Sequence, residues 1–236
     1  MIVRHPIESV TERLSDGVGQ VATAVKPKLR GWIHAGMFPV VVAAGIVLVA
    51  LSPTTTARVT NAIFSLSSVL LFGLSAVYHR GHWSPRTTRV LRRLDHSNIF
   101  LIIAGTYTPL SALLLIESRA RVLLWIVWSG AVAGLLARVL WLNAPRWLYV
   151  PIYLALGWIA VAFMPQFWQS GTDGPAVVWF LAAGGAAYTL GAVVYALKRP
   201  NPSPRWFGFH EVFHALTVIG FGCTYVSVSI ATYALR

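Results

Sequence analysis

The chain has 236 residues, of which 56% are hydrophobic and only 11% are charged, and its mean hydropathy is +0.66. About a quarter of the residues in a typical soluble domain are charged, so this composition excludes a soluble globular protein and predicts a membrane protein. The net charge of +12 would suit a nucleic-acid binder, but Lys and Arg stand in short gaps between apolar runs, as in membrane topology signals. The single cysteine, Cys223, excludes an intrachain disulfide and a CxxC metal site.

The first 29 residues contain no continuous apolar stretch, so they do not resemble a signal peptide. Their apolar residues recur three and four positions apart, at Ile7, Val10, Leu14, Val18, Val21 and Val25. This spacing predicts a weak amphipathic helix within a segment over 1–29 that lies on the cytoplasmic surface of the membrane.

Seven apolar stretches follow, each close to the roughly 20 residues that a membrane-spanning helix needs. The predicted spans are approximately 32–52, 60–79, 94–116, 121–142, 147–168, 175–197 and 206–234. The connections between them are short. Residues 30–236 are therefore expected to form one all-α domain, a seven-transmembrane helix bundle with no appended soluble domain.

Lysine and arginine are distributed unequally between the two ends of these spans. Fifteen lie in the N-terminal segment and in or beside the connections after the second, fourth and sixth spans, whereas four lie on the other side. Basic connections of this length stay in the cytoplasm. The chain is therefore expected to be a multi-pass protein of the cell membrane with a cytoplasmic N-terminus and an external C-terminus.

Ionisable residues inside spans are costly and usually face a functional interior. The second span ends with Ser75 and His79, which are four residues apart and share one helix face. Asp95 is predicted in the first turn of the third span, where the helix dipole favours a carboxylate. The seventh span begins with "HEVFH", which contains His210 and His214. The predicted topology brings all five residues to the cytoplasmic face.

Three imidazoles, from His79, His210 and His214, are suited to hold a tetrahedral zinc ion with one position open for water. Asp95 would orient a ligand or bind that water. The alternative is that each histidine caps a helix end at the membrane interface and pairs with a carboxylate. The convergence of four ionisable residues at one membrane depth favours the metal site.

The chain also resembles the haemolysin III family, which belongs with the progestin and adiponectin receptors (PAQR) and is related to the alkaline ceramidases. The matching stretches are "RGWIHAG" at 30–36, "SAVYHR" at 75–80, "RLDHSNIFLIIAGTYTP" at 93–109 and "HEVFH" at 210–214. The likeness covers essentially everything from residue 26 onward.

This resemblance implies a seven-helix bundle with a zinc ion near the cytoplasmic face, bound by His79, His210 and His214. It implies that Asp95 contacts the water on the metal, and it maps the family's serine to Ser75. The family is associated with ceramidase-like amide hydrolysis in its receptor relatives. Its bacterial-type members are associated with haemolysis and with membrane fluidity or energetics.

Two functions are compatible with such a site. In the first, the protein is a zinc-dependent hydrolase of lipid amide bonds, and its partner is a ceramide-like or other N-acyl membrane lipid. Zinc would activate water, Asp95 would accept a proton from it, and Ser75 would stabilise the developing oxyanion. In the second, zinc only joins helices, and the protein senses or adjusts the membrane, or perturbs it as a haemolysin does.

An intramembrane HExxH protease is a third interpretation of "HEVFH". Such an enzyme completes its site with a distant aspartate, and "TDGP" at 172–175 offers Asp173. The predicted topology places Asp173 on the outer side, about 30 Å from the histidines across the membrane. The sequence therefore disfavours a protease.

Other polar residues near the motifs are given plainer roles. His34 is expected to anchor the first span at the membrane interface, and the alternative is that it lines the same cytoplasmic vestibule as the metal site. His96 lies about 100° around the helix from Asp95, where it contacts either the site or lipid headgroups. Glu211 is expected to pair with an arginine or to act as a base. "GTYTP" at 105–109 is expected to be a closely packed kink with no ligand contact.

Overall fold

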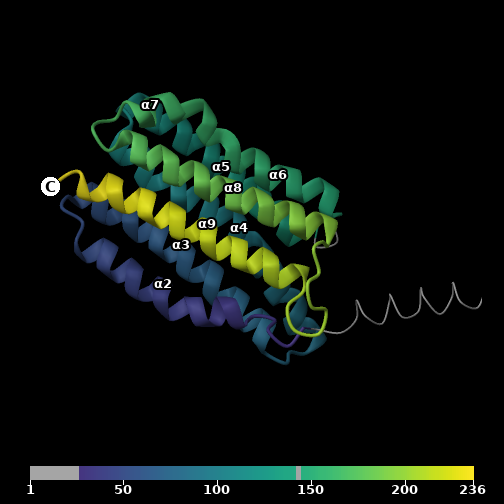
Figure 1. The fold of residues 1–236 in the computed structure, drawn as a ribbon. Coiled ribbons are helices and arrows are strands. Elements are labelled where there is room, and N and C mark those ends of the chain that lie inside the picture. Colours follow the sequence, from purple (N-terminus) through teal and green to yellow (C-terminus); the bar gives the residue numbers. More distant parts are fainter. Residues whose placement is uncertain (1–26, 142–144) are drawn as a thin grey trace, which may run out of the picture.

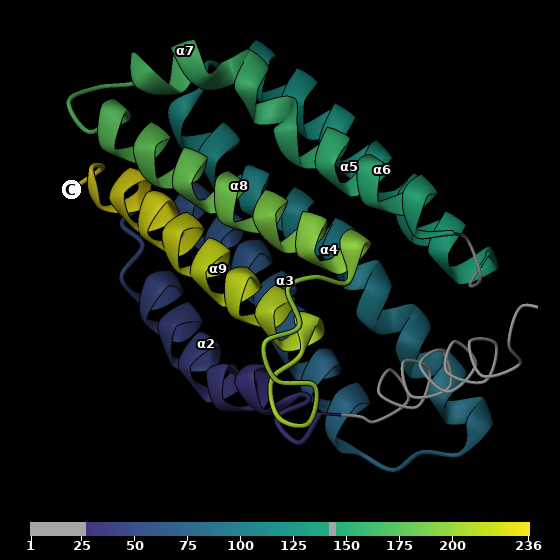
Figure 2. The same cartoon turned by 45° about the vertical axis from the view of Figure 1, so that its right-hand side comes forward.

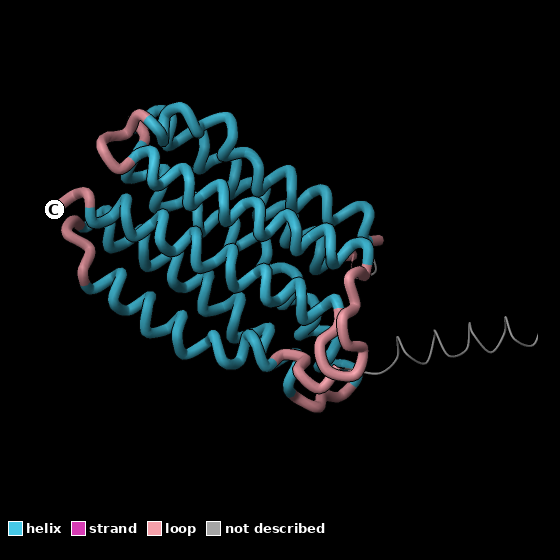
Figure 3. The backbone as a smooth tube through the Cα atoms, in the orientation of Figure 1, coloured by secondary structure: helices cyan, strands magenta, loops and turns pink. Residues whose placement is uncertain are grey.

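The computed structural model describes residues 27–141 and 145–236 (Figure 1). In this part of the chain the regular elements are helices, and seven helical stretches are long and apolar enough to cross a membrane (Figure 3). The predicted all-α bundle with seven spans is thereby confirmed. The amphipathic segment predicted over 1–29 falls almost entirely outside the described residues.

The observed spans overlap the predicted ones but differ at their ends. Their bounds are α2 (Trp32–Ala50), α3 (Thr55–Arg80), α4 (Pro85–Leu114), α5 (Glu117–Leu140), α6 (Arg146–Trp158) continued by η1 (Ile159–Phe163) and α7 (Met164–Trp168), α8 (Gly174–Leu197) and α9 (Phe209–Tyr233). The largest difference is at α4, which begins well before the predicted third span.

Side-chain caps explain why α3 and α4 begin early. The hydroxyl of Thr54 accepts the backbone N–H of Ala57 at 3.1 Å, and the hydroxyl of Ser84 accepts that of Thr87 at 3.2 Å. Pro85 occupies the first turn of α4, where a missing N–H costs nothing. These first turns are polar, so a search for apolar stretches leaves them out.

The fifth span is interrupted because a side chain from α4 enters its hydrogen-bond ladder. The hydroxyl of Tyr107 donates to the carbonyl of Gly157 at 2.5 Å and accepts the N–H of Ala160 at 2.8 Å. These backbone groups would otherwise bond within an α-helix, and the span changes there from α6 to the 3₁₀ helix η1.

Consecutive spans pack side by side, and the last closes on the first (Figures 1 and 2). α2 packs on α3, α3 on α4 and α4 on α5, while α6 contacts α8, α8 packs on α9, and α9 returns to α2. α4 and α9 also touch and are the most deeply buried spans. The chain ends after α9 at the end of the bundle opposite the start of α2 (Figure 1), as seven crossings require.

Asn61 fixes the register of α3 against α9 at that far end. Its side-chain amide donates to the hydroxyl oxygens of Ser52 and Thr232, both at 2.9 Å. Hydrogen bonds between side chains of different spans fix the axial position of one helix relative to the other. This axial position determines where the end of α3 meets the start of α9, at the opposite end of the bundle.

Candidate metal site and its cavity

The predicted metal ligands meet at the end of the bundle where α2 begins. His79 lies in the last turn of α3, and His210 and His214 lie in the first two turns of α9. One ligand atom from each of the three residues lies within 4.8 Å of the other two. The side chains predicted to bind a metal are therefore brought together by helices that are far apart in the sequence.

The spacing of one pair of ring nitrogens fits a tetrahedral ion. Nε2 of His79 lies 3.2 Å from Nε2 of His210, and two ligands about 2.0–2.1 Å from a tetrahedral zinc are roughly 3.3 Å apart. A hydrogen bond between two imidazoles would explain that pair alone. It would not explain the ring of His214, whose centroid lies 4.5 Å from that of His210 and 5.1 Å from that of His79.

Three nitrogen donors in a largely buried pocket suit zinc and several other transition metals. His79 and His214 are 7% and 2% exposed. A metal binds the neutral imidazole through a ring nitrogen. The donor set supports a metal site without choosing among these ions.

Asp95 and Ser75 lie beside the three histidines. Oδ2 of Asp95 is 3.8 Å from Nε2 of His79, and the hydroxyl of Ser75 hydrogen-bonds to the Asp95 carboxylate. Because α4 begins at Pro85, Asp95 stands about three turns into the helix. The predicted first-turn position was wrong, and the helix dipole does not act on this carboxylate, since its effect fades within one turn.

Glu211 holds the start of α9 in place. Its carboxylate pairs with Arg30, which precedes α2, and accepts the backbone N–H of Gly208 at 2.8 Å. Its side chain is 1% exposed. Two roles were considered for Glu211, and its pairing with an arginine is confirmed. Both carboxylate oxygens are thus engaged away from the histidines, which further disfavours a protease base here.

Replacing Glu211 by Ala is expected to lower stability by about 3 kcal/mol, because it removes one partner of a buried ion pair and a helix cap. For a chain of this size that corresponds to a fall in Tm of roughly 6–12 °C. The matched control is Glu117→Ala, since the pair of Glu117 with Arg121 is exposed and contributes little. A Glu211→Ala protein with unchanged Tm but no activity would contradict the structural role.

His34 is not an exposed anchor of α2 at the interface; it lines the cavity beside the histidine cluster, which is the alternative role considered for it. Its ring is 2% exposed and stacks on His214, with centroids 3.9 Å apart and planes 6° apart. Phe72 meets the His34 ring edge-on at 4.9 Å. The stack restricts the orientation of the His214 ring, which is a predicted metal ligand. A histidine within an apolar span was the available signal, because such residues are costly unless they serve a site.

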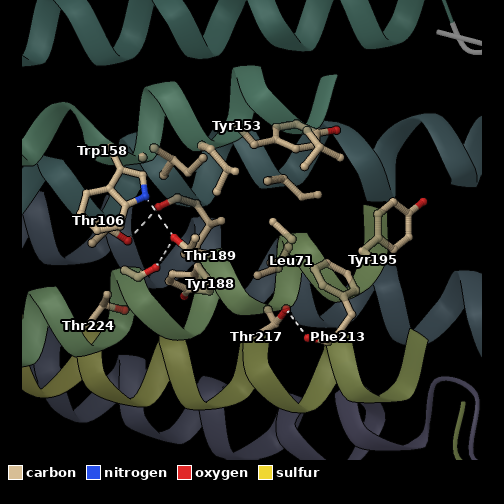
Figure 4. A pocket seen from close by; sticks show the side chains of 18 of the residues that line it. Leu71, Thr106, Tyr153, Trp158, Tyr188, Thr189, Tyr195, Phe213, Thr217 and Thr224 are labelled. Carbon is tan, nitrogen blue, oxygen red and sulfur yellow. Dashed lines mark hydrogen bonds between the residues drawn. The ribbon is translucent and has the colours of Figure 1, made fainter. Parts of the chain in front are cut away.

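A cavity of about 170 Å³ extends from the histidine cluster into the bundle. Asp95, His210 and His214 are among the residues that line it. Farther in, its walls are mainly aliphatic and aromatic, with the hydroxyls of Thr106 and Tyr188 among them (Figure 4). The cavity is thus a mostly apolar chamber with the candidate metal site in its wall.

The lining of the cavity includes exposed residues in the middle of the fifth span. Trp158 and Val161 both line it and are 46% and 48% exposed. They flank the break that Tyr107 causes. In a bilayer this surface faces the lipid chains. Thr106 and Tyr107 line the cavity as well, so the "GTYTP" stretch contributes to a cavity wall in addition to packing between helices.

Comparison with known proteins assigns this chain to a protein family. The model of the family described as "Haemolysin-III related" matches residues 22–225. The chain belongs to the haemolysin III family. The resemblance carried by the four sequence stretches is confirmed, and the membrane bundle with its histidine cluster is that of a haemolysin III-like integral membrane protein.

Three relatives show how far the similarity extends. "Hemolysin-3" of Bacillus cereus is 28% identical over 146 residues, which is 62% of this chain and 65% of that protein. "Hemolysin-3 homolog" of Bacillus subtilis (strain 168) is 31% identical over 148 residues, which is 62% of this chain and 68% of that protein. The human "Monocyte to macrophage differentiation factor" is 24% identical over 168 residues, which is 70% of this chain and 68% of that protein. The match thus covers slightly less than two thirds of the first relative and slightly more of the others.

Proposed function

We propose that this haemolysin III family member is a zinc-dependent hydrolase of lipid amide bonds. The observation that carries the proposal is the position of the histidine cluster in the wall of a mostly apolar cavity whose lining includes exposed, lipid-facing residues of the fifth span. A metal that only joined helices would need no such chamber. A lipid whose acyl chain enters the cavity would bring its headgroup linkage to the histidines.

His79, His210 and His214 would hold the ion, which supplies Lewis-acid polarisation of a carbonyl and acidifies water. Asp95 is placed to accept a proton beside His79. The hydroxyl of Ser75 donates to the Asp95 carboxylate, and once Asp95 has taken up a proton the hydroxyl would be free to donate to developing negative charge. The stack with His34 keeps the ring of His214 oriented.

The proposed substrates are ceramide-like and other N-acyl membrane lipids. Their long chains match the aliphatic and aromatic walls of the cavity, and their amide carbonyl is the group that a metal site of this kind polarises. The test is release of free fatty acid from a panel of such lipids by the purified protein, with His79→Ala as the control. Release no greater than that of the control on every lipid would refute the proposal.

A second candidate is a non-enzymatic role in which zinc joins α3 to α9. Two observations favour it: all three histidines come from these two helices, and two relatives carry the name "Hemolysin-3", which points to lysis or another effect on membranes. The two functions differ in their response to Asp95, which a structural ion would not need as a proton acceptor.

The proposed location is the cell membrane, with the histidine end of the bundle toward the cytoplasm. The support is the excess of Lys and Arg on that side. Reporter fusions at Lys198 and at Arg236 are expected to report opposite sides, with Lys198 cytoplasmic. The same side for both fusions would contradict this orientation.

A further inference from the structure

The first turns of α4 extend beyond the neighbouring helices at the histidine end of the bundle. Asp95 lies beside His79, and α3 ends one residue after His79, at Arg80. Because α4 begins at Pro85, the stretch from Pro85 to Asp95 is about 15 Å long. Figure 2 shows this stretch beyond the start of α9. In a bilayer it passes through the headgroup layer, which is about 5–7 Å thick on each side.

Three arginines share one side of this stretch. Arg86, Arg89 and Arg93 follow one another at three and four residues, and Arg86 and Arg93 lie about 160–180° around the helix from Asp95. Arg86 and Arg89 are exposed, whereas Arg93 is partly buried and its Nε has no hydrogen-bond partner. The ion pairs among the described residues include none of the three. This arginine stripe therefore points away from the metal site and carries positive charge that the described residues do not neutralise.

Exposed carboxylates are absent from this end of the described chain. Glu211 is 1% exposed and is paired with Arg30, and the side chain of Asp95 is 12% exposed in the wall of the cavity. The other described acidic residues, Glu117 and Asp173, lie at the opposite end, at the starts of α5 and α8. The electrostatic potential around the arginine stripe is thus positive, and it attracts anions.

Exposed apolar side chains adjoin the arginine stripe. Val90 and Leu94 are one turn apart and are 48% and 41% exposed. Each follows an arginine of the stripe by one residue, so the apolar pair lies about 100° around the helix from Arg89 and Arg93. A helix with a basic face beside an apolar face contacts headgroups and the upper part of the acyl chains together. A soluble acidic partner would leave the apolar pair uncovered, so the surface fits a lipid.

We propose that Arg86, Arg89 and Arg93 bind the headgroup phosphate of an anionic phospholipid, whose glycerol and first methylenes lie against Val90 and Leu94. A guanidinium keeps its charge and donates several hydrogen bonds to a phosphate. Basic clusters beside the end of a span bind anionic lipids in this way. The site lies outside the cavity, and it does not depend on whether the protein hydrolyses a lipid.

The test is competition between dioleoyl phosphatidylglycerol and dioleoyl phosphatidylcholine for the purified full chain, measured by native mass spectrometry. The two lipids share their chains and phosphate and differ in net charge. Wild-type protein is expected to bind phosphatidylglycerol at least about tenfold more tightly, because each basic residue near an anionic surface contributes roughly fivefold. The combined change Arg86→Gln, Arg89→Gln and Arg93→Gln should remove most of this preference.

The matched control is the combined change Arg58→Gln, Arg119→Gln and Arg121→Gln. It removes the same charge from exposed positions at the opposite end of the bundle, and it should leave the preference unchanged. In wild-type protein the preference should also weaken as the ionic strength rises, because salt screens exposed charges.

Equal binding of the two lipids by wild-type protein would overturn the proposal, whether or not the variants fold. An unchanged preference in the folded variant of the arginine stripe, or a preference that salt does not weaken, would overturn it as well. A preference that appears only after Glu8→Gln, Glu12→Gln and Asp16→Asn would show that the acidic N-terminal segment occupies the arginines in place of a lipid.

Discussion

Replacing Asp95 by Asn is expected to lower the rate of lipid amide hydrolysis by roughly 10²–10⁴ while leaving the metal bound. Asparagine has nearly the same shape and can still hydrogen-bond to Ser75, but it cannot accept a proton. The carboxylate lies 3.8 Å from Nε2 of His79 and is not part of the three-nitrogen set. The measurement is turnover of an N-acyl lipid, with zinc content and Tm determined on the same samples.

The matched control is Asp173→Asn, an exposed carboxylate before α8 at the other end of the bundle, which should keep activity, zinc and Tm. A stable, zinc-loaded Asp95→Asn protein with full activity would exclude proton transfer through this residue. Loss of zinc or stability in step with activity would favour the structural role of the site.

Replacing both His210 and His214 by Ala is expected to remove nearly all bound zinc. The two residues supply two of the three ring nitrogens of the cluster, and the single imidazole of His79 is too few ligands for a stable site. Because metal binding stabilises the folded state, the Tm of the variant should fall as well. Elemental analysis of purified protein measures the zinc directly, and wild-type protein should carry about one ion per chain.

The control for this change is His82→Ala, which removes an exposed histidine just beyond α3. Its zinc content and Tm should match those of the wild type. Zinc unchanged in the double variant would refute the assignment of these histidines as ligands.

The bundle and the meeting of the site residues were predictable from the sequence. An apolar helix must reach a minimum length to cross a bilayer, so counting spans decides which helix ends share one side. His79 ends one span while His210 begins another, and that count alone brought them to the same end of the bundle. The structure places their ring nitrogens in contact distance there.

The features that the sequence did not predict depend on how each helix is rotated about its axis. α2 is apolar on all sides, so its pattern does not show that His34 faces inward onto His214. Tyr107 breaks a span to which it does not belong, and near that break the sequence within 147–168 offers only Gly157 and Pro165 as signs of it. Arg138 lies where a topology signal is expected, which concealed its burial. The cavity results from these cross-helix contacts together.

The most direct measurement is hydrolysis of an N-acyl lipid in ¹⁸O-labelled water, followed by mass spectrometry of the released fatty acid. Zinc-loaded wild-type protein should release fatty acid that carries one ¹⁸O atom from the solvent. Metal-stripped protein should release none until zinc is restored. Absence of labelled fatty acid from the zinc-loaded protein across ceramides and other N-acyl lipids, or equal release after the metal is stripped, would contradict metal-dependent amide hydrolysis.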